Sequence, residues 1–311
     1  VETGFNCPFE GSVLPTANFA VRSLLLDEAS EGRDVPQNEG VFRPVHVIAP
    51  RGSIFNPNPP RGCEARFTQI NRIPDQVMQA LGSALPERVT AGNSANVSCF
   101  AYSGEQDGGA DDYWVTIEVN EGSYGGMHGR DGLDAIDTLM ANTRNNPIEE
   151  MELNAPLICE RYELRDEAPA PGQWRGGLGA IKRWRFLAET SASSTGDNRS
   201  VDPPRGLFGG KDGRAGSVHL NPGAEKAEIL PAKISNHRFR AGDRLEITLV
   251  SGAGYGSPFK REPGLVLADV LDGLLSSAEA KSDYGVIIAA DGNSIDEKAT
   301  AEYRSGKANK A

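Results

Sequence analysis

Residues 127–152 carry the densest set of side chains that could do chemistry in this sequence. Carboxylates whose pKa values are tuned by their neighbours act as general bases in hydrolysis and in proton abstraction. Asparagine and arginine side chains orient polar substrates by hydrogen bonding. The candidates for such a catalytic site are Asp131, Asp134, Asn142, Arg144, Glu149 and Glu152.

The same residues also have a structural interpretation. Asp131 could cap a helix that follows it in the sequence. Glu149 and Glu152 could form ion pairs with Arg144 or Arg161, as most charged residues near a protein surface do. The residue types alone leave both interpretations open.

A second candidate is the segment "QWRGGLGAIKRW" at residues 173–184. A phosphate-binding P-loop ends in Lys-Ser/Thr before a helix, so that amide N–H groups and the helix N-terminus face the anion. This segment lacks that ending and runs into strand-like residues, which favours a tight turn with glycine at positive φ. The alternative is that Arg175 and the amides of Gly176 and Gly177 face a subunit interface or a phosphorylated intermediate. These three are therefore the candidate cofactor-binding residues.

Other familiar sites are missing from the sequence. The glycines of "SGAGYGSP" at residues 251–258 precede "FKREPG", which breaks the helix that a dinucleotide site needs. No G-x-S-x-G nucleophile motif and no CxxC pair is present. The histidines are isolated, without the spacing of joint metal ligands, and they are His46, His128, His219 and His237. We expect this chain to bind no metal or cofactor by itself.

The composition excludes some classes of partner. The 311 residues carry a formal net charge of −11, which would repel the phosphate backbone of a nucleic acid. No apolar run approaches the roughly 20 residues that cross a bilayer. The first residues lack the basic and apolar regions of a signal peptide. These features predict a cytoplasmic protein that binds neither nucleic acid nor membrane.

Hydrophobic periodicity predicts the elements that position the candidate residues. The first half shows helical patterns at 15–29, 73–89 and 132–143, and strand patterns at 44–49 and 113–119. The second half shows short strands between Gly, Pro and Asp clusters, then a helix at 265–285 and a charged tail. The predicted strands are 157–165, 180–190, 216–221, 227–235 and 243–250.

This pattern predicts an α+β fold in two parts. Residues 1–154 form a mixed α/β part that carries the polar cluster. Residues 155–311 form a β-rich part, a sandwich or barrel, that ends in a helix. The glycine and proline content, at 36 and 20 residues, predicts a turn-rich chain.

Several motifs, in their order and spacing, resemble the hydantoinase B/oxoprolinase family. They include "VPQNEGVFRPVHVIAPRGSIFNPNPP" (35–60), "YGGMHGRDGLDAIDTLMANT" (124–143) and "NTRNNPIEEMELNAPLICERYELR" (142–165). "WRGGLGAIKRW" (174–184) and the long segment 242–288 complete the set. The resemblance covers nearly the whole chain.

This resemblance implies a subunit, or the carboxyl-terminal part of one, in an ATP-dependent cyclic amide hydrolase of the hydantoinase/5-oxoprolinase type. An actin-like ATPase partner of the hydantoinase A type would bind ATP and Mg²⁺ and phosphorylate the small-molecule substrate. Family members carry about 200 further amino-terminal residues with Asp- and His-rich metal motifs. None of these matches the present sequence. We therefore expect a divalent metal to belong to a missing amino-terminal part or to a companion chain.

Two other functions fit the same residues. A sister branch of the family carboxylates ketones such as acetone and acetophenone, through phosphorylated intermediates. A third interpretation is a non-catalytic scaffold subunit that joins catalytic chains. The absent metal motifs favour the scaffold, whereas the polar cluster at 131–152 argues against it.

Overall fold

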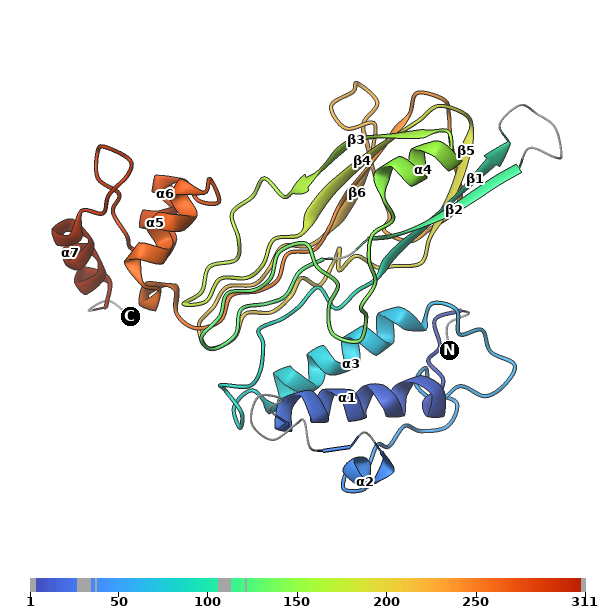
Figure 1. The fold of residues 1–311 in the computed structure, drawn as a ribbon, viewed down its shortest axis with the longest axis horizontal. Coiled ribbons are helices and arrows are strands. Elements are labelled where there is room, and N and C mark those ends of the chain that lie inside the picture. The colour runs from blue at the N-terminus through green and yellow to red at the C-terminus, as the bar shows by residue number, and fades with distance from the viewer. Residues whose placement is uncertain (1–3, 27–34, 37, 106–112, 121, 309–311) are drawn as a thin grey trace.

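The computed structural model describes residues 4–26, 35–36, 38–105, 113–120 and 122–308. A β-sandwich forms one end, helices from the two ends of the chain form separate groups, and extended segments connect these parts (Figure 1). Within the described residues, no helix is both long enough and apolar enough to span a membrane.

The sandwich consists of two antiparallel sheets. One has the strand order β2-β1-β5-β8, and the other has the order β3-β4-β9-β6-β7. The strands of the first sheet are β1 (Ser98–Glu105), β2 (Tyr113–Asn120), β5 (Thr190–Ser194) and β8 (Ile234–Phe239). Those of the second are β3 (Leu157–Leu164), β4 (Ala180–Phe186), β6 (Ser217–Leu220), β7 (Glu228–Leu230) and β9 (Arg244–Thr248).

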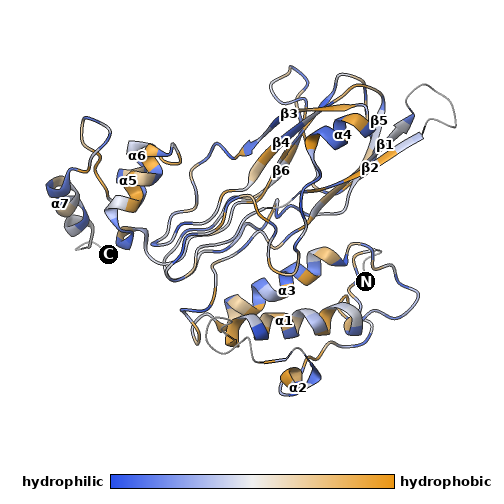
Figure 2. Ribbon diagram, viewed as in Figure 1, coloured by the Kyte–Doolittle hydropathy of each residue, from blue (hydrophilic) through white to orange (hydrophobic). Residues whose placement is uncertain are grey.

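Alternation along the strands places apolar side chains between the sheets. In β4, Trp184 and Phe186 are buried, while Arg183 and Arg185 are partly exposed on the other face. The same core takes buried side chains from both sheets, among them Phe100, Tyr102, Phe239, Leu245 and Ile247. Hydrophobic residues accordingly mark the strands in Figure 2.

A buried ion pair crosses this core. Lys182 of β4 donates to Glu118 of β2 at 2.5 Å, and the two side chains are 2% and 3% exposed. The other carboxylate oxygen accepts from the Trp184 indole at 2.9 Å and from the Tyr102 hydroxyl at 3.2 Å. Burial and the neighbouring Glu118 raise the pKa of Tyr102 well above its ordinary value. The network therefore fixes the register of one sheet against the other.

Extended segments outside the strands run side by side from the sandwich toward α5 (Pro263–Leu271) (Figure 1). We call them the glycine bundle, and they are the segments around Gly125–Gly132, Gly172–Gly179, Gly210–Gly213 and Gly252–Gly254. The amide of Gly177 donates to the Tyr124 carbonyl, and the amide of Gly252 donates to the Gly177 carbonyl, both at 2.9 Å. A Cβ on Gly252 would lie 2.0 Å from the Tyr124 oxygen, so only glycine allows this approach. Similar contacts hold Gly125, Gly126, Gly132, Gly172, Gly176, Gly179, Gly210, Gly213 and Gly254.

The amino-terminal helices pack against this bundle. α1 (Leu14–Leu25) contacts α3 (Arg66–Leu81), and Leu24 and Met78 share a core with Tyr255 of the bundle. The shorter helices of this region are η1 (Phe9–Val13) and α2 (Glu39–Phe42).

The carboxyl-terminal helices form a third core. Val266, Leu275 and Tyr284 are buried together in it, and the apolar side of α5 is evident in Figure 2. The carboxyl-terminal elements are η3 (Pro258–Lys260), α5, α6 (Ser277–Tyr284) and α7 (Glu297–Ala308), while α4 (Ile148–Asn154) lies beside β2 and β3.

The α+β fold with its sandwich is confirmed, and most predicted strands have a counterpart. The predicted helix at 265–285 is two helices, because the chain turns at Gly273, where φ is +77°. The charged tail contains α7. The predicted strand at 227–235 divides into β7 and β8, which belong to different sheets.

Three predicted elements of the first half are wrong. Residues 44–49 form no strand, and the Ile48 side chain is 90% exposed. The second helix begins at Arg66, so that Pro74 lies inside it instead of at its start. Residues 132–143 form no helix, because their backbone belongs to the glycine bundle, where the Tyr124 amide donates to the Leu133 carbonyl at 3.0 Å.

The predicted division at residue 154 does not separate the strands. β1 and β2, which precede it, share a sheet with β5 and β8, which follow it. The cause lies in the buried side chains of β1 and β2, among them Phe100, Tyr102 and Trp114, which share one core with residues of the second half.

Replacing Lys182 with Met leaves Glu118 buried without its cation. We expect the free energy of unfolding to fall by about 3–5 kcal/mol, the cost of breaking a buried pair from one side. Urea denaturation followed by tryptophan fluorescence measures the loss. The control is Arg183→Met on the exposed face of β4, where the pair with Glu246 contributes about 0–1 kcal/mol. Equal losses in both variants would contradict the assignment.

A methyl group in the glycine bundle provides a second test. Gly252→Ala should destabilise the protein by about 3 kcal/mol or more, because carbonyl groups occupy the space of the new Cβ. Gly306→Ala is the control, since nothing lies within 4 Å of a Cβ there and alanine suits a helix better than glycine. Thermal unfolding by circular dichroism measures both. A Gly252→Ala protein as stable as the wild type would refute the packing argument.

Candidate functional site

Three of the predicted residues come together where the glycine bundle meets α5. Asp131 pairs with Arg261, and Asp134 pairs with Arg175. Arg175 and Arg261 both pair with Asp269, and sequence reasoning selected neither Arg261 nor Asp269. We call these five residues the Arg175–Arg261 network. Asp131 does not cap a helix, because it binds this network instead.

Each guanidinium of the network lies between two carboxylates. Arg261 donates to Asp131 at 2.7 and 2.8 Å and to Asp269 at 2.9 Å. Arg175 donates to Asp269 at 3.2 Å and to Asp134 at 3.3 Å. The backbone amide of Arg175 adds a bond to Asp131 at 2.8 Å. The network thereby links the bundle to the carboxyl-terminal helices.

The inner part of the network is closed, and its outer part faces solvent. The side chains of Arg261 and Asp269 are 1% and 8% exposed, against 28% for Asp131 and 30% for Asp134. Burial alone would lower the pKa of both arginines, but the surrounding carboxylates outweigh it and raise both values. Burial raises the pKa of Asp269, although the two guanidiniums oppose that rise.

Asp134 is anchored through one oxygen only. Its Oδ1 accepts from the Leu178 amide at 2.7 Å and from Arg175. Its Oδ2 has no hydrogen-bond partner among the described residues and belongs to a partly exposed side chain. This carboxylate is oriented by the protein and still able to accept a proton or a hydrogen bond from a bound molecule.

The candidate cofactor-binding glycines lie in the bundle. The Gly176 amide donates to Ala170 at 3.0 Å, and the Gly177 amide donates to Tyr124. A Cβ at either glycine would lie 2.1 Å from a carbonyl oxygen. Both amides are therefore occupied by backbone carbonyls. The predicted tight turn with glycine at positive φ is wrong, because Gly176 and Gly177 have no positive φ and lie in extended segments whose backbones pack against their neighbours.

The other four predicted residues lie apart from the network. Asn142 and Arg144 are exposed, and Glu149 occupies the exposed first turn of α4. Glu152 accepts from the Cys159 amide at 2.8 Å, which ties α4 to β3. The expected ion pairs of these glutamates with arginine are absent among the described residues.

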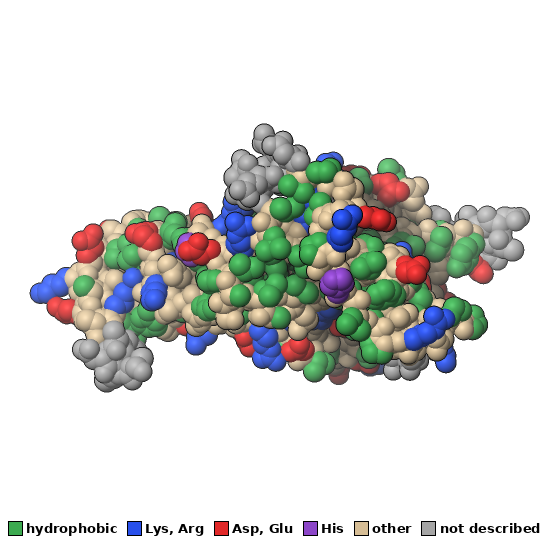
Figure 3. All heavy atoms as spheres, turned by 90° about the horizontal axis from the view of Figure 1, so that it is seen from below, with side chains coloured by type: hydrophobic (Ala, Val, Ile, Leu, Met, Phe, Trp, Pro, Cys, Tyr) green, Lys and Arg blue, Asp and Glu red, His purple; other side chains and the backbone are tan. Residues whose placement is uncertain are grey.

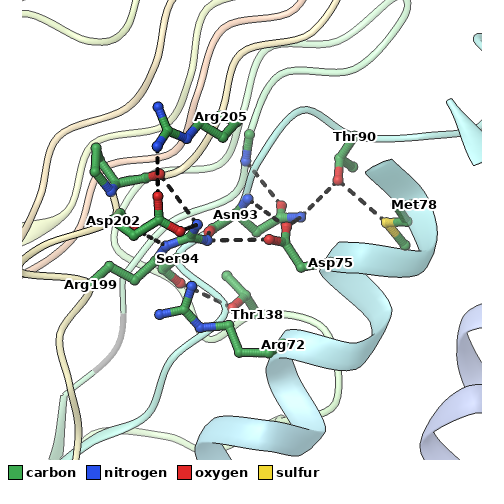
Figure 4. Close-up of polar contacts among 12 residues, drawn as sticks. Arg72, Asp75, Met78, Thr90, Asn93, Ser94, Thr138, Arg199, Asp202 and Arg205 are labelled. Carbon is green, nitrogen blue, oxygen red and sulfur yellow. Dashed lines mark hydrogen bonds and ion pairs between the residues drawn. The ribbon is translucent and has the colours of Figure 1, made fainter. Parts of the chain in front are cut away.

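A second buried ion pair lies where α3 meets the bundle (Figure 4). Arg199 donates to Asp75 at 3.2 Å, and each side chain is 2% exposed. Asp75 accepts in addition from the backbone and side chain of Asn93, at 2.9 and 3.0 Å. Burial and the neighbouring Arg72 lower the pKa of Arg199. We call Asp75, Asn93 and Arg199 the Arg199–Asp75 network.

Backbone conformation marks the same place. Asn198 and Arg199 both have positive φ, at +46° and +40°, which is rare for non-glycine residues. Sequence reasoning missed this network because it placed Asp75 at a helix start. With the helix begun at Arg66, Asp75 falls near Met78 on the buried face, where a carboxylate needs a cation. Nothing in the sequence identifies Arg199 as that cation.

The described residues contain no group of three or more His, Cys, Asp or Glu side chains placed to hold a metal ion. Both networks consist mainly of groups that satisfy one another. Their chemical capacity lies at the outer carboxylates, above all Asp134, which can orient a polar ligand or take up a proton.

Replacing Arg261 with Met should loosen the carboxyl-terminal helices, because Asp131 and Asp269 lose the cation between them. We expect hydrogen exchange in residues 258–308 to become faster than in the wild type and exchange in β4 to stay unchanged. Mass spectrometry measures both regions. The exposed neighbour Lys260 provides the control, and Lys260→Met should exchange like the wild type. Unchanged exchange in the Arg261 variant would show that the network does not hold these helices.

A family model described as hydantoinase B/oxoprolinase matches residues 1–258. The chain is 42% identical over 300 residues to a protein of Pseudomonas sp. (strain NS671) that is named as the B component of a D-/L-hydantoinase. That match covers 96% of this chain and 50% of the relative. The beta subunit of the caprolactamase of Pseudomonas jessenii is 30% identical, over 86% of this chain and 48% of the relative.

Two solved structures share the fold. Acetone carboxylase superposes with a TM-score of 0.76 at 19% identity, over 99% of this chain and 45% of that chain. The ATP-dependent caprolactamase of Pseudomonas jessenii superposes with a TM-score of 0.76 at 24% identity, over 97% and 52%.

This chain spans about half the length of the curated relatives named above. Within that span the family model covers the amino-terminal helices, the sandwich and most of the glycine bundle. The resemblance inferred from the sequence motifs is thereby confirmed: the chain belongs to the hydantoinase B/oxoprolinase family.

Proposed function

We propose that the chain is part of the B-type subunit of an ATP-dependent cyclic amide hydrolase. The observation that carries the proposal is the 42% identity to the hydantoinase-type relative across 96% of the chain. The 30% identity to a caprolactamase component supports the same substrate class, since hydantoins and caprolactam both contain an amide bond within a ring.

Hydrolysis of such a ring needs activation, because an amide carbon is a poor electrophile. In the proposed reaction an actin-like ATPase partner transfers the γ-phosphoryl group of ATP, with Mg²⁺, to the amide oxygen. Water then adds to the activated carbon and gives up its protons, and phosphate leaves. The ring C–N bond breaks as the nitrogen takes up a proton, giving a carboxylate and a free N–H group. A divalent metal, if the enzyme uses one, belongs to a companion chain or to the other half of the family's B-type subunit.

Within this scheme the outer carboxylates of the Arg175–Arg261 network serve the substrate. Asp134 would take a proton from the attacking water or hold the ring N–H through its unpaired Oδ2. Arg175 and Arg261 would keep Asp131 and Asp134 in position. Asn142, Arg144, Glu149 and Glu152 stay candidates for contacts with a companion subunit.

Two other functions remain open to test. The fold shared with acetone carboxylase favours a subunit of a ketone carboxylase as the second candidate. A non-catalytic scaffold is the third. Assays on the complex with its companion subunits separate all three: ATP-dependent opening of hydantoin supports our proposal, ATP-dependent incorporation of labelled bicarbonate into acetone supports the carboxylase, and activity that persists without this chain supports the scaffold.

Replacing Asp134 with Asn in the complex tests the assigned residue. We expect kcat/KM for ring opening to fall by about 100-fold, the usual contribution of a general base. Asp272→Asn, at the exposed carboxyl-terminal end of α5, is the matched control and should stay within about twofold of the wild type. Thermal unfolding of each complex shows whether folding is intact. A folded Asp134→Asn complex with full activity would remove Asp134 from the mechanism.

A further inference from the structure

β2 carries exposed apolar side chains along one face. The strand lies at the edge of its sheet, in the order β2-β1-β5-β8. Trp114 and Glu118 point into the sandwich and are 8% and 2% exposed. Tyr113, Val115 and Ile117 alternate with them and are 63%, 65% and 58% exposed. We call these three side chains the β2 stripe.

The side chains beside the β2 stripe are too small to cover it. Val115 and Ile117 lie in the middle of the strand, in register with described residues of β1, which is paired in turn with β5. The positions in the same rows on β1 and β5 are Ala101, Ser103, Ser191 and Ser193. The stripe is therefore an apolar ridge beside a low, flat surface that another protein surface can approach closely.

The outer face of the other sheet is different, because it carries ion pairs. Glu160 pairs there with Arg185 and Arg244. Glu246 pairs with Arg183. Charged side chains suit a sheet face that meets water, whereas exposed apolar residues on an edge strand promote association with another chain. One outer face of the sandwich is thus suited to solvent and the other to a protein partner.

The curated relatives contain a second half that packs against the half that this chain matches. About half the length of the hydantoinase-type and caprolactamase relatives lies outside their match with this chain. We call that length the remaining half. In the relatives both halves belong to one chain, so their contact is permanent, and permanent interfaces are more apolar than transient ones.

The arrangement of the chain favours a contact at the sandwich. η1 and α1 begin at the same end of the molecule as the sandwich, whereas α5 and α7 lie at the opposite end (Figure 1). Seen from below, hydrophobic side chains are exposed over the helices and at the sandwich end (Figure 3). An amino-terminal part, which the family resemblance predicts, would join this chain at the sandwich end.

We propose that the β2 stripe and the small residues beside it form the surface on which the remaining half of the B-type subunit docks. The proposal rests on the proposed assignment to a B-type subunit and not on the reaction. The partner surface that fits is apolar and lies flat on the sheet, with an edge or helix of its own against the ridge.

Photo-crosslinking identifies what lies on the stripe. p-Benzoyl-phenylalanine replaces Ile117 in the assembly of this chain with its companion subunits, and mass spectrometry identifies the crosslinked peptides. We expect crosslinks to the remaining half, whether that half is a separate chain or part of the same one. The control places the same probe at Ile229, which is 73% exposed on β7, the edge strand of the other sheet. That probe should give far less of the same crosslink.

Variants test whether the apolar stripe makes the contact. Val115→Lys should lower the yield of the crosslink from position 117 at least about tenfold, because a lysine charge opposes docking of an apolar surface. Ile229→Lys is the matched control and should leave the yield within about twofold of the wild type. Thermal unfolding shows whether each variant is folded. If Val115→Lys fails to fold, Val115→Ser keeps a neutral side chain and should lower the yield by a smaller factor.

Crosslinks from position 117 only to the ATPase, only to a second copy of this chain, or to no protein overturn the proposal. An unchanged yield in the folded Val115 variants also overturns it. The crosslink forms without ATP or substrate, so an assembly that fails to open hydantoin leaves this test unaffected. A missing crosslink likewise leaves the hydrolase proposal standing.

Discussion

In the glycine bundle, carbonyl oxygens of one segment lie where a side chain on a glycine of the neighbouring segment would place its Cβ atom. The distance from the ideal Cβ to such an oxygen is 2.0 Å at Gly252 and 2.1 Å at Gly176. Backbones this close exclude side chains from the interior of the bundle, so hydrogen bonds between amides and carbonyls, and not hydrophobic burial, hold it together. The helices and the sandwich are positioned by how they attach to this scaffold.

Attachment is largely ionic at two places. The Arg175–Arg261 network joins the bundle to the carboxyl-terminal helices, and the Arg199–Asp75 network joins it to α3. Long arginine side chains suit this task, because the bundle presents carbonyls that a guanidinium can reach, beside the apolar contacts that Tyr255 makes with Leu24 and Met78. Arg199, for example, donates to the carbonyls of Asn93 and Asp202 as well as to Asp75. The candidate catalytic carboxylates are the solvent-facing part of such an attachment.

Alternation along a strand is a local signal, so the sequence predicted most of the strands, including "YWVTIEV" at 113–119. It placed that strand outside the sandwich, and the apolar residues Tyr113, Val115 and Ile117 of the strand are exposed. It failed at 132–143, where a helix-like spacing of apolar residues was overruled by Gly132, whose backbone lies against Tyr124. It found Asp131 and Asp134 through the polar density of residues 127–152, and Arg175 through the glycine-rich segment 173–184. Arg261 and Asp269 lie 130 and 94 residues from their partners, and no local pattern connects residues so distant.

The left-handed backbone at Asn198 and Arg199 has a consequence for how the amino-terminal helices could detach. Each such residue costs roughly 1–2 kcal/mol, and the bonds of the Arg199 side chain offset that strain. The loop and the ion pair therefore form and break as one cooperative unit. Loss of the pair with Asp75 would leave the left-handed backbone at Arg199 with less compensation, so the junction of α3 depends on the loop and the ion pair together.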